Sequence, residues 1–387
     1  MDFKKELIND ILPFWLSNAV DTECGGIFTC LDRKGKIYGE EKSVWFQGRA
    51  LWTFSKAYNL IKKAPEYLSA AKLIYDFLPK CEDADGRMFF TVTRDGRGIR
   101  KRRYYFSETF AAIGCAEYYL ASHDPLALCA ARKYFDIAYE CFTGKIQNAP
   151  KFNPETYDMK ALSPVMIMLS TAQTMRAADP ERRARYNEIA KACLDEILYG
   201  GFLTDKALLE GVSSDGSFCD TPSGRTVNPG HSLEAAWFVI SEGLLTENAA
   251  AVEAGRKIID ITLPIGWDTE HGGIIAFADI CAEPPVQLEW DMKLWWPQCE
   301  AMIALRLAYL AFKEERYLEE YEKIKKYCIN NFIDKENGEW YGYLHYDNTV
   351  SVSLKGNIFK GPFHIPRLYM IMSVMDEYAD ILPYFKR

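Results

Sequence analysis

Hydrophobic residues recur at helical spacing in twelve long stretches of the 387-residue chain. The first stretch shows the pattern, because Phe3, Leu7, Ile11 and Trp15 lie about one turn apart on a single face. Between the helical stretches, glycine-punctuated segments with alternating side chains predict short hairpins at residues 25–35, 86–96, 272–279 and 338–347. The helices are expected at residues 2–18, 44–62, 66–80, 105–121, 126–142, 163–178, 182–198, 230–246, 248–263, 296–313, 316–332 and 363–382.

Four of these helices open with a proline that leads into an apolar run. Pro164, Pro229, Pro297 and Pro362 are separated by 65, 68 and 65 residues, and six units of that size fill the chain. Helices that open with polar side chains alternate with amphipathic helices, which indicates an inner and an outer ring. The sequence therefore predicts an all-α fold, an (α/α)6 barrel in which residues 1–387 form a single domain. The short hairpins are expected at the mouth, where the inner helices begin.

Composition narrows the possible partners of this fold. The chain is 49% hydrophobic and 14% aromatic, which supplies a large core and leaves rings to line a cavity. A formal charge of −8 argues against nucleic acid or an anionic membrane as a partner. The eleven cysteines form no Cys-x-x-Cys pair, and no apolar run approaches the roughly 18 residues of a membrane span. We therefore expect reduced thiols and a cytoplasmic location.

Two of the five histidines occupy equivalent places in the repeat. His231 and His364 each follow a helix-opening proline by two residues. Asn228 is a favourable N-cap, so His231 is expected in the first turn of a helix, where the partial positive charge favours a neutral imidazole. A single histidine in the first turn of a helix is more often structural, but two histidines at equivalent positions of two repeats indicate function. His123, His271 and His345 are interpreted as loop or turn residues.

Charged residues also stand inside predicted helices, beside aromatic side chains. They are Arg49, Glu108, Glu234 and Glu300, and their neighbours include Trp45 and Trp296. One interpretation is a structural ion network, because a buried charge needs a partner; the other is a polar cavity with aromatic platforms. The sequence contains no nucleotide-binding loop and no His-Glu-x-x-His metal motif. The residues thus favour metal-free acid–base chemistry on a polar, uncharged substrate.

Several longer motifs resemble those of the N-acylglucosamine 2-epimerase family. The matching segments are Trp45-Phe46-Gln47-Gly48-Arg49, Asn228-Pro229-Gly230-His231-Ser232-Leu233-Glu234, Met292-Lys293-Leu294-Trp295-Trp296-Pro297-Gln298-Cys299-Glu300, Gly338-Glu339-Trp340-Tyr341-Gly342 and Lys360-Gly361-Pro362-Phe363-His364-Ile365-Pro366-Arg367. The resemblance implies an (α/α)6 barrel that converts N-acetylglucosamine to N-acetylmannosamine by inversion at C2. It also implies a homodimer and no cofactor required for the chemistry, with ATP as a possible allosteric activator.

The same resemblance assigns roles to residues of this chain. His231 and His364 would be the two acid–base groups, because inversion at C2 requires proton removal from one face and delivery to the other. Arg49 would stabilise the enolate, and Glu300 could hold a sugar hydroxyl, assist ring opening or fix a histidine tautomer. We expect the substrate to contact six further residues: Glu234, Glu108, Trp45, Trp296, Lys293 and Arg367.

Three alternatives remain open at this point. The chain could be a 2-epimerase or aldose–ketose isomerase acting on a free aldose or a disaccharide, although such relatives use a further histidine where this chain has Met166 and Met168. A glycoside hydrolase would take a carboxylate pair from Glu108, Glu234 and Glu300, which leaves the two matched histidines unexplained. A protein-binding module would have no use for acid–base residues in a cavity.

Overall fold

The computed structural model describes residues 1–102 and 104–385, and among them it contains the twelve predicted helices. The first is continuous, built from α1 (Phe3–Glu6), a π-helical turn (Leu7–Ile11) and α2 (Leu12–Ala19). The others are α3 (Val44–Leu60), α4 (Pro65–Phe77), α5 (Phe106–Ser122), α6 (Pro125–Phe142), α7 (Leu162–Ala178), α8 (Arg183–Tyr199), α9 (Pro229–Leu245), α10 (Ala249–Gly266), α11 (Trp295–Phe312), α12 (Glu315–Asn331) and α13 (His364–Tyr378). A short α14 (Leu382–Phe385) follows, and 3-10 turns at Leu78–Cys81 and Pro180–Arg182 lie beside α4 and α8.

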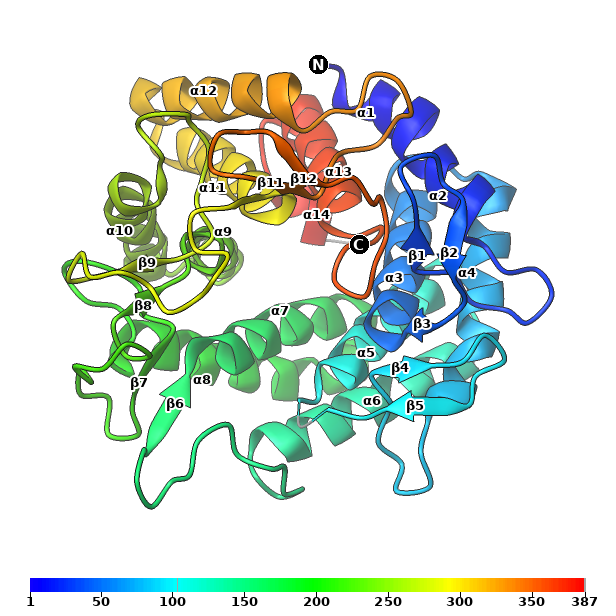
Figure 1. Cartoon of the computed structure of the whole chain (residues 1–387). Coiled ribbons are helices and arrows are strands. Elements are labelled where there is room, and N and C mark those ends of the chain that lie inside the picture. The colour runs from blue at the N-terminus through cyan, green and yellow to red at the C-terminus, as the bar shows by residue number, and fades with distance from the viewer. Residues whose placement is uncertain (103, 386–387) are drawn as a thin grey trace.

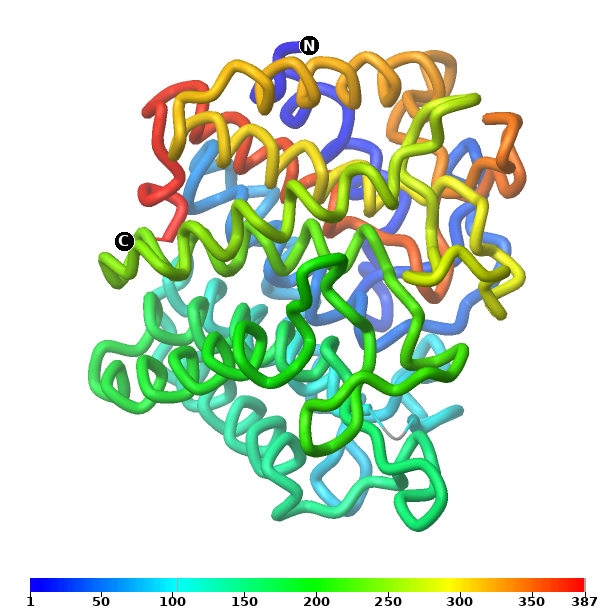
Figure 2. Tube along the Cα trace, turned by 90° about the vertical axis from the view of Figure 1, so that its left-hand side faces the viewer, coloured from blue at the N-terminus to red at the C-terminus, as the bar shows by residue number. Residues whose placement is uncertain are grey.

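Six inner helices form a closed ring. Figure 1 shows this ring along its axis, and Figure 2 shows the same helices from the side. Helices α3, α5, α7, α9, α11 and α13 each contact the next in this order, and α13 returns to α3. The outer helices pack against this ring, and the pairing joins α3 with α4, α5 with α6, α7 with α8, α9 with α10, α11 with α12 and α13 with α1. The predicted (α/α)6 barrel is therefore confirmed, while its interpretation as a single domain stays a prediction.

Burial explains which helices lie inside. Nearly every residue of α9 from Pro229 to Gly243 is buried, as expected for a helix surrounded by others. By contrast, α12 buries a stripe that includes Tyr317, Tyr321 and Ile324, and its other side is charged. The alternation of all-round apolar and amphipathic helices thus fixes the two rings. None of the described helices is both long and apolar enough to cross a bilayer.

The strands are short and connect the ends of each helix pair. They are β1 (Cys30–Leu31), β2 (Ile37–Gly39), β3 (Lys42–Ser43), β4 (Thr91–Val92), β5 (Gly98–Arg100), β6 (Met159–Ala161), β7 (Gly211–Ser213), β8 (Thr226–Val227), β9 (Ala278–Asp279), β10 (Lys293–Leu294), β11 (Tyr343–Leu344) and β12 (Val350–Val352). In four units, the strand before the inner helix pairs antiparallel with the strand after its outer helix: β3 with β4, β6 with β7, β8 with β9 and β10 with β11.

This arrangement gathers the strands around the first turns of the inner helices, where the sequence placed the mouth. The hairpin prediction was wrong for residues 272–279, because β9 pairs with β8, about 50 residues earlier in the chain, rather than with a neighbouring strand. Glycine punctuation marks a turn there but does not identify the strand's partner.

A repeated hydrogen-bond pattern sets the orientation of two inner helices. The Gln47 and Gln298 side chains are fully buried, and each bonds both to the N–H and to the C=O of an isoleucine that follows a Gly-Gly pair. Two residues further along each helix, about 200° around its axis, stand Arg49 and Glu300. The glutamines therefore hold the loop side of α3 and α11, and Arg49 and Glu300 point towards the barrel interior.

Candidate active site

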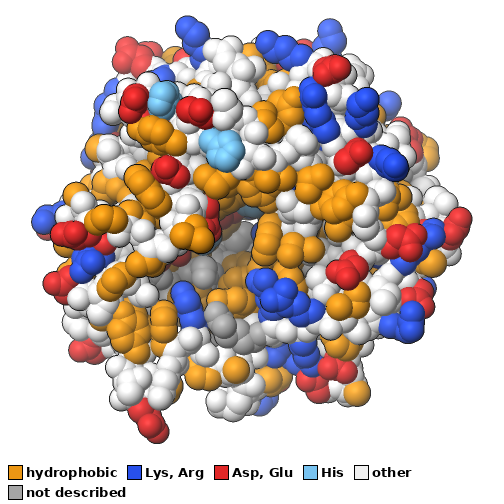
Figure 3. Space-filling view, in the orientation of Figure 1, with side chains coloured by type: hydrophobic (Ala, Val, Ile, Leu, Met, Phe, Trp, Pro, Cys, Tyr) orange, Lys and Arg blue, Asp and Glu red, His pale blue; other side chains and the backbone are white. Residues whose placement is uncertain are grey.

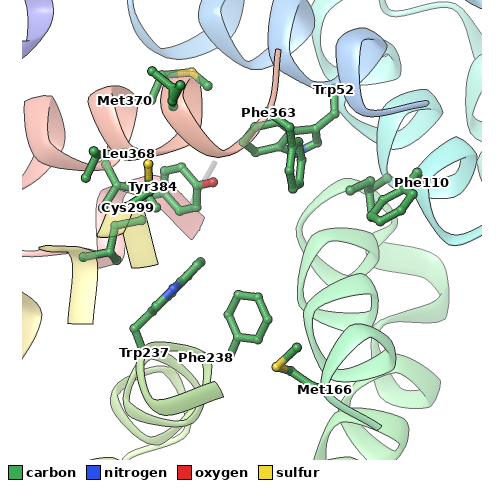
Figure 4. Close-up of a cluster of buried hydrophobic side chains, with 14 of the residues drawn as sticks. Trp52, Phe110, Met166, Trp237, Phe238, Cys299, Phe363, Leu368, Met370 and Tyr384 are labelled. Carbon is green, nitrogen blue, oxygen red and sulfur yellow. The ribbon is translucent and has the colours of Figure 1, made fainter. Parts of the chain in front are cut away.

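A cavity of about 300 Å³ lies inside the ring of inner helices, and its lining includes Trp45, Arg49, His231, Glu234 and Arg367. The mouth of the barrel is seen in Figure 3 as a hollow near the centre of the face, bordered by hydrophobic side chains. Figure 4 shows aromatic side chains from different inner helices converging below it, among them Phe110, Phe238 and Phe363. Charged groups in this cavity thus stand against low-dielectric walls, where their mutual interactions are strong.

The two matched histidines both contact the ring of one tryptophan. His231 lines the cavity, and the ring of Trp296 lies 5.1 Å from the His231 ring and 5.8 Å from the His364 ring, centroid to centroid. His364 is the first residue of α13 and is 6% exposed, between the lining residues Phe363 and Arg367. Trp296 approaches so closely that a Cβ on Gly230 would lie 2.5 Å from its ring. The residue before His231 must therefore be glycine.

His231 carries its own carboxylate partner. Asn228 caps α9 by accepting a 3.0 Å hydrogen bond from the His231 backbone N–H, as predicted. The His231 Nδ1 donates to Glu210, 3.0 Å and 3.1 Å from its two oxygens. Burial alone would lower the pKa of His231, but the charge and hydrogen bond of Glu210, with smaller effects from Glu234 and Glu300, raise it above its usual value. The pKa of His231 is therefore shifted in the opposite direction to that expected from the helix terminus, because the effect of the carboxylate outweighs it.

The surroundings of His364, by contrast, favour its neutral form. Its Nδ1 donates to Glu300 Oε1 at 2.7 Å, which leaves Nε2 free to accept a proton. Burial, followed by the nearby guanidinium groups of Arg367 and Arg49, lowers the pKa of His364 well below its usual value. The two imidazoles thus have opposite protonation preferences, His231 towards the charged form and His364 towards the neutral form, as an acid–base pair requires.

Glu300 is a fully buried junction between three side chains. Besides His364, it accepts from Trp237 Nε1 at 2.8 Å and from Arg367 Nη2 at 2.7 Å. Of the three roles that the sequence left open for Glu300, this geometry favours fixing the His364 tautomer. Its oxygens are already bonded to protein, so direct contact with a sugar hydroxyl is less favoured.

Aromatic rings surround the guanidinium group of Arg49. Its guanidinium carbon lies 4.0 Å from the Phe110 centroid and 4.7 Å from that of Phe363. Its Nε has no hydrogen-bond acceptor among the described residues. Burial, partly offset by Glu234 and reinforced by Arg367, lowers the pKa of Arg49 to about 9. Arg49 is therefore a cation in the cavity wall with donor capacity left for a ligand oxygen.

Arg367 joins the two carboxylates of the cavity. Its Nη2 donates to Glu234 Oε1 and to Glu300 Oε1. In the described part of the chain, one group of side chains could ligate a metal, formed by Glu234, Glu300 and His364 with ligand atoms within 4.8 Å of one another. The guanidinium already bonds both carboxylates of that group and supplies its positive charge. The prediction that no metal takes part stays a prediction.

The fit of a nucleotide can be assessed at the opposite end of the barrel. A groove of about 810 Å³ there is lined by Arg176, Arg183 and Lys191. Arg176 is paired with Glu242 at 2.8 Å and Lys191 with Asp195 at 2.5 Å, so two of the three cations are already neutralised. This groove does not fit a triphosphate.

Two residues that the sequence assigned to substrate lie outside the cavity. Glu108 is fully buried and accepts from Arg87 Nε at 2.5 Å and from the Met88 backbone N–H at 2.9 Å. Lys293 is also fully buried, and donates to Asp268 at 2.5 Å. For Glu108 this contact is the structural ion pair that the sequence analysis had considered as an alternative. Neither Glu108 nor Lys293 lines the cavity, so the structure does not support substrate binding by either residue.

The role of Lys293 is clear from its counterpart in another repeat. Lys42 precedes α3 as Lys293 precedes α11, and its Nζ pairs with Asp21 at 2.8 Å. Asp21 and Asp268 each lie four residues before a Gly-Gly pair. In both units the ion pair between this lysine and the aspartate therefore stabilises a loop at the mouth of the barrel. Trp45, Trp296, Glu234 and Arg367, by contrast, do lie at the cavity or in contact with its histidines.

Glu210 is the site residue that the sequence analysis missed. It stands directly before β7, 21 residues ahead of His231, in a segment with no helical periodicity. A general-base histidine commonly has an orienting carboxylate, but no spacing rule selects Glu210 from the 54 acidic residues of the chain. The Glu210 backbone N–H donates to the Thr226 carbonyl at 3.1 Å, in β8 directly before α9, and this contact brings Glu210 to His231.

Known proteins resemble this chain over most of its length. The profile of the family described as N-acylglucosamine 2-epimerase (GlcNAc 2-epimerase) matches residues 26–363. N-acylglucosamine 2-epimerase of Bos taurus is 34% identical over 371 residues, covering 93% of this chain and 87% of its own. Cellobiose 2-epimerase of Bacteroides fragilis is 26% identical, covering 95% of this chain and 96% of its own.

Solved structures support the same fold. Cellobiose 2-epimerase from Spirochaeta thermophila superposes with a TM-score of 0.83 at 23% identity, covering 98% of this chain and 96% of its own. The resemblance inferred from the motifs around both histidines is thus confirmed by the length and identity of these matches. This chain belongs to the N-acylglucosamine 2-epimerase family.

Proposed function

We propose that this chain interconverts N-acetylglucosamine and N-acetylmannosamine by inverting the configuration at C2 of the open-chain sugar. The observation that supports this most directly is the pair of histidines that both contact Trp296 and have opposite protonation preferences. The reaction needs one group that removes a proton and another that delivers one. In the reverse reaction the two groups exchange these roles.

In one direction, neutral His364 removes the C2 proton through Nε2, and the C2–H electron pair moves towards the C1 carbonyl oxygen. Protonated His231 then delivers a proton from its Nε2 to the opposite face of C2, and the carbonyl re-forms. In the other direction the roles are exchanged. Acid–base assistance of this kind contributes about 10²–10⁴-fold to the rate.

The negative charge that develops on the C1 oxygen needs a fixed donor. Arg49 is suited to this because its Nε lacks a partner and aromatic rings exclude water from it. Removing one such donor commonly costs about 10²–10³-fold in rate. Glu210 and Glu300 are positioning residues, which hold Nδ1 of each histidine and direct Nε2 towards the substrate.

The competing functions are less compatible with the arrangement of the carboxylates. A glycoside hydrolase needs two free carboxyl groups flanking a bond, yet Glu234 and Glu300 share one guanidinium, and Glu108 is bonded elsewhere. An epimerase or isomerase of the cellobiose or mannose type would place a further histidine in the third repeat. At that place, apolar Met166 lines the cavity.

Two further expectations come from the family resemblance: ATP would act as an activator without hydrolysis, and the chain would form a homodimer. A cytoplasmic location is expected from the cysteine pattern. Activity measured with and without ATP, with ADP assayed alongside, tests the first of these. ADP appearing in step with turnover would contradict it, and a monomeric mass in solution would contradict the second.

The central experiment is proton NMR of the purified protein with N-acetylmannosamine in D₂O. Formation of N-acetylglucosamine carrying deuterium at C2 is expected, because the delivering histidine exchanges its proton with solvent. Mannose, glucose and cellobiose serve as comparison substrates. Conversion of these sugars with no conversion of the N-acetyl sugar would favour the free-aldose alternative.

A further inference from the structure

A second and larger cavity adjoins the catalytic one. Its volume is about 870 Å³, against about 300 Å³ for the catalytic cavity. Tyr104 and Ser163 line both, so the two spaces meet at these side chains. Small-molecule sites span about 300–1,000 Å³, so the catalytic cavity holds little more than the reacting ring. The side cavity therefore offers room for a substituent.

The side cavity lies behind His231. Glu210 forms part of its wall, and accepts the hydrogen bond from His231 Nδ1 that orients the imidazole. A histidine that exchanges a proton with C2 must approach that carbon to about 3–3.5 Å. The substituent on C2 thus begins close to the junction of the two cavities, whereas groups on more distant carbons begin further from it.

The lining favours an uncharged group with both apolar and hydrogen-bonding parts. Two carboxylates of the wall are already paired, Glu196 with Lys160 at 2.7 Å and Glu210 with His231. Most of the remaining wall is aromatic or aliphatic: Tyr104, Tyr105, Phe142, Pro150, Phe152, Met159, Pro164, Val165 and Phe277. Within this wall the Tyr105 hydroxyl, on a side chain 7% exposed, and Gln287 Oε1 are buried and have no hydrogen-bond partner among the residues that the structure describes. Buried polar atoms are rarely left unpaired, which points to a ligand group as their partner.

We infer that the side cavity is the binding site for the N-acyl group of the substrate, and that it admits acyl chains longer than acetyl. This inference rests on the proposed function, because it presupposes an amide on C2. A hydroxyl on the chain would pair with Tyr105 or Gln287, so hydroxyacyl groups are expected to bind better than alkyl groups of the same length.

The test compares kcat/KM for N-acetyl-, N-butanoyl- and N-hexanoylmannosamine in three proteins. Ala161→Leu adds bulk in β6, at a residue that lines the side cavity but not the catalytic one. Ser213→Leu is the matched control, because it adds bulk on the paired strand β7 at a residue that lines neither cavity. Turnover of the N-acetyl substrate shows that each variant is folded.

The parent chain is expected to turn over the longer substrates within about tenfold of the N-acetyl sugar. Ala161→Leu should lower kcat/KM for the longer chains by about tenfold or more relative to kcat/KM for the N-acetyl sugar, since one or two displaced methylenes have that effect. Ser213→Leu should change neither the turnover of the N-acetyl substrate nor that of the longer substrates. If Ala161→Leu were poorly folded, Ser223→Leu at another part of the wall should also reduce turnover of the hexanoyl substrate.

Two results would overturn the inference. One is rejection of every chain longer than acetyl by the parent protein while the N-acetyl sugar reacts normally, and the other is unchanged acyl selectivity in Ala161→Leu. Loss of a reducing disaccharide, rather than of long acyl chains, in that variant would assign the cavity to a second sugar ring instead. Absence of C2 exchange in any N-acyl sugar would refute the proposed function itself, which is a distinguishable outcome.

Discussion

Replacing Glu210 by glutamine tests whether a carboxylate keeps His231 protonated. Glutamine has the same shape and still accepts from Nδ1, so the tautomer is retained and only the negative charge is lost. A hydrogen bond to a charged group contributes about 1.5–3 kcal/mol, and little of this is screened because the two side chains are only 27% and 19% exposed. At about 1.36 kcal/mol per tenfold, we expect kcat/KM to fall about 10- to 150-fold on the alkaline side of the profile.

The sign of the pH dependence follows from the direction of each shift. The pKa of His231 is raised by Glu210, so its proton is present at and above the ordinary histidine value and is lost as pH rises through the raised value. Rate therefore falls on the alkaline side, and Glu210→Gln moves that fall to lower pH. The pKa of His364 is lowered, so the acid side of the profile lies below the ordinary value of 6.5 and should not move.

The assay is the initial rate of epimerisation between about pH 5 and pH 9, the range in which histidines titrate. Glu196→Gln is the matched control, because Glu196 lines the same side cavity but pairs with Lys160 rather than with a histidine. An alkaline limb that stays in place in Glu210→Gln, with a rate loss below about twofold, would refute the reasoning. A shift of equal size in Glu196→Gln would show that the effect is a general one of cavity charge.

Three other predictions address the remaining residues. His231→Asn and His364→Asn should each abolish net epimerisation yet retain deuterium exchange into a single epimer, one variant for each sugar; near-normal epimerisation by either would exclude the two-base assignment. Arg49→Ala should slow exchange into both sugars by about 10²–10³-fold, and NMR that shows only one of them slowed would contradict a shared enolate donor. Lys293→Met leaves Asp268 buried without its partner, so urea unfolding should show a loss of about 3–5 kcal/mol with kcat of the folded fraction nearly unchanged. A large loss of kcat with unchanged stability would instead indicate that Lys293 contacts the substrate.

The sequence was sufficient for the helices and for their arrangement in two rings. Periodicity is a local property, since apolar positions three and four apart define a helical face whatever that face packs against. The repeat of Pro229 and Pro297 then gave the number of units, and identical places in the repeat identified His231 and His364 as partners. Boundaries agreed closely, and the main failure was β9, whose partner strand lies in a distant segment.

The tertiary structure decided which charges meet. Arg49, Glu108 and Lys293 looked alike in the sequence, as charged residues near the openings of inner helices. Closure of the loops paired Glu108 with Arg87 and left Arg49 among aromatic rings. It also brought Glu210 to His231 and thereby shifted the pKa of His231 upwards, against the direction expected from the helix terminus alone. Pairing and pKa depend on which groups lie within a few ångströms and on how much water they lose, and both are set by contacts between residues far apart in the chain.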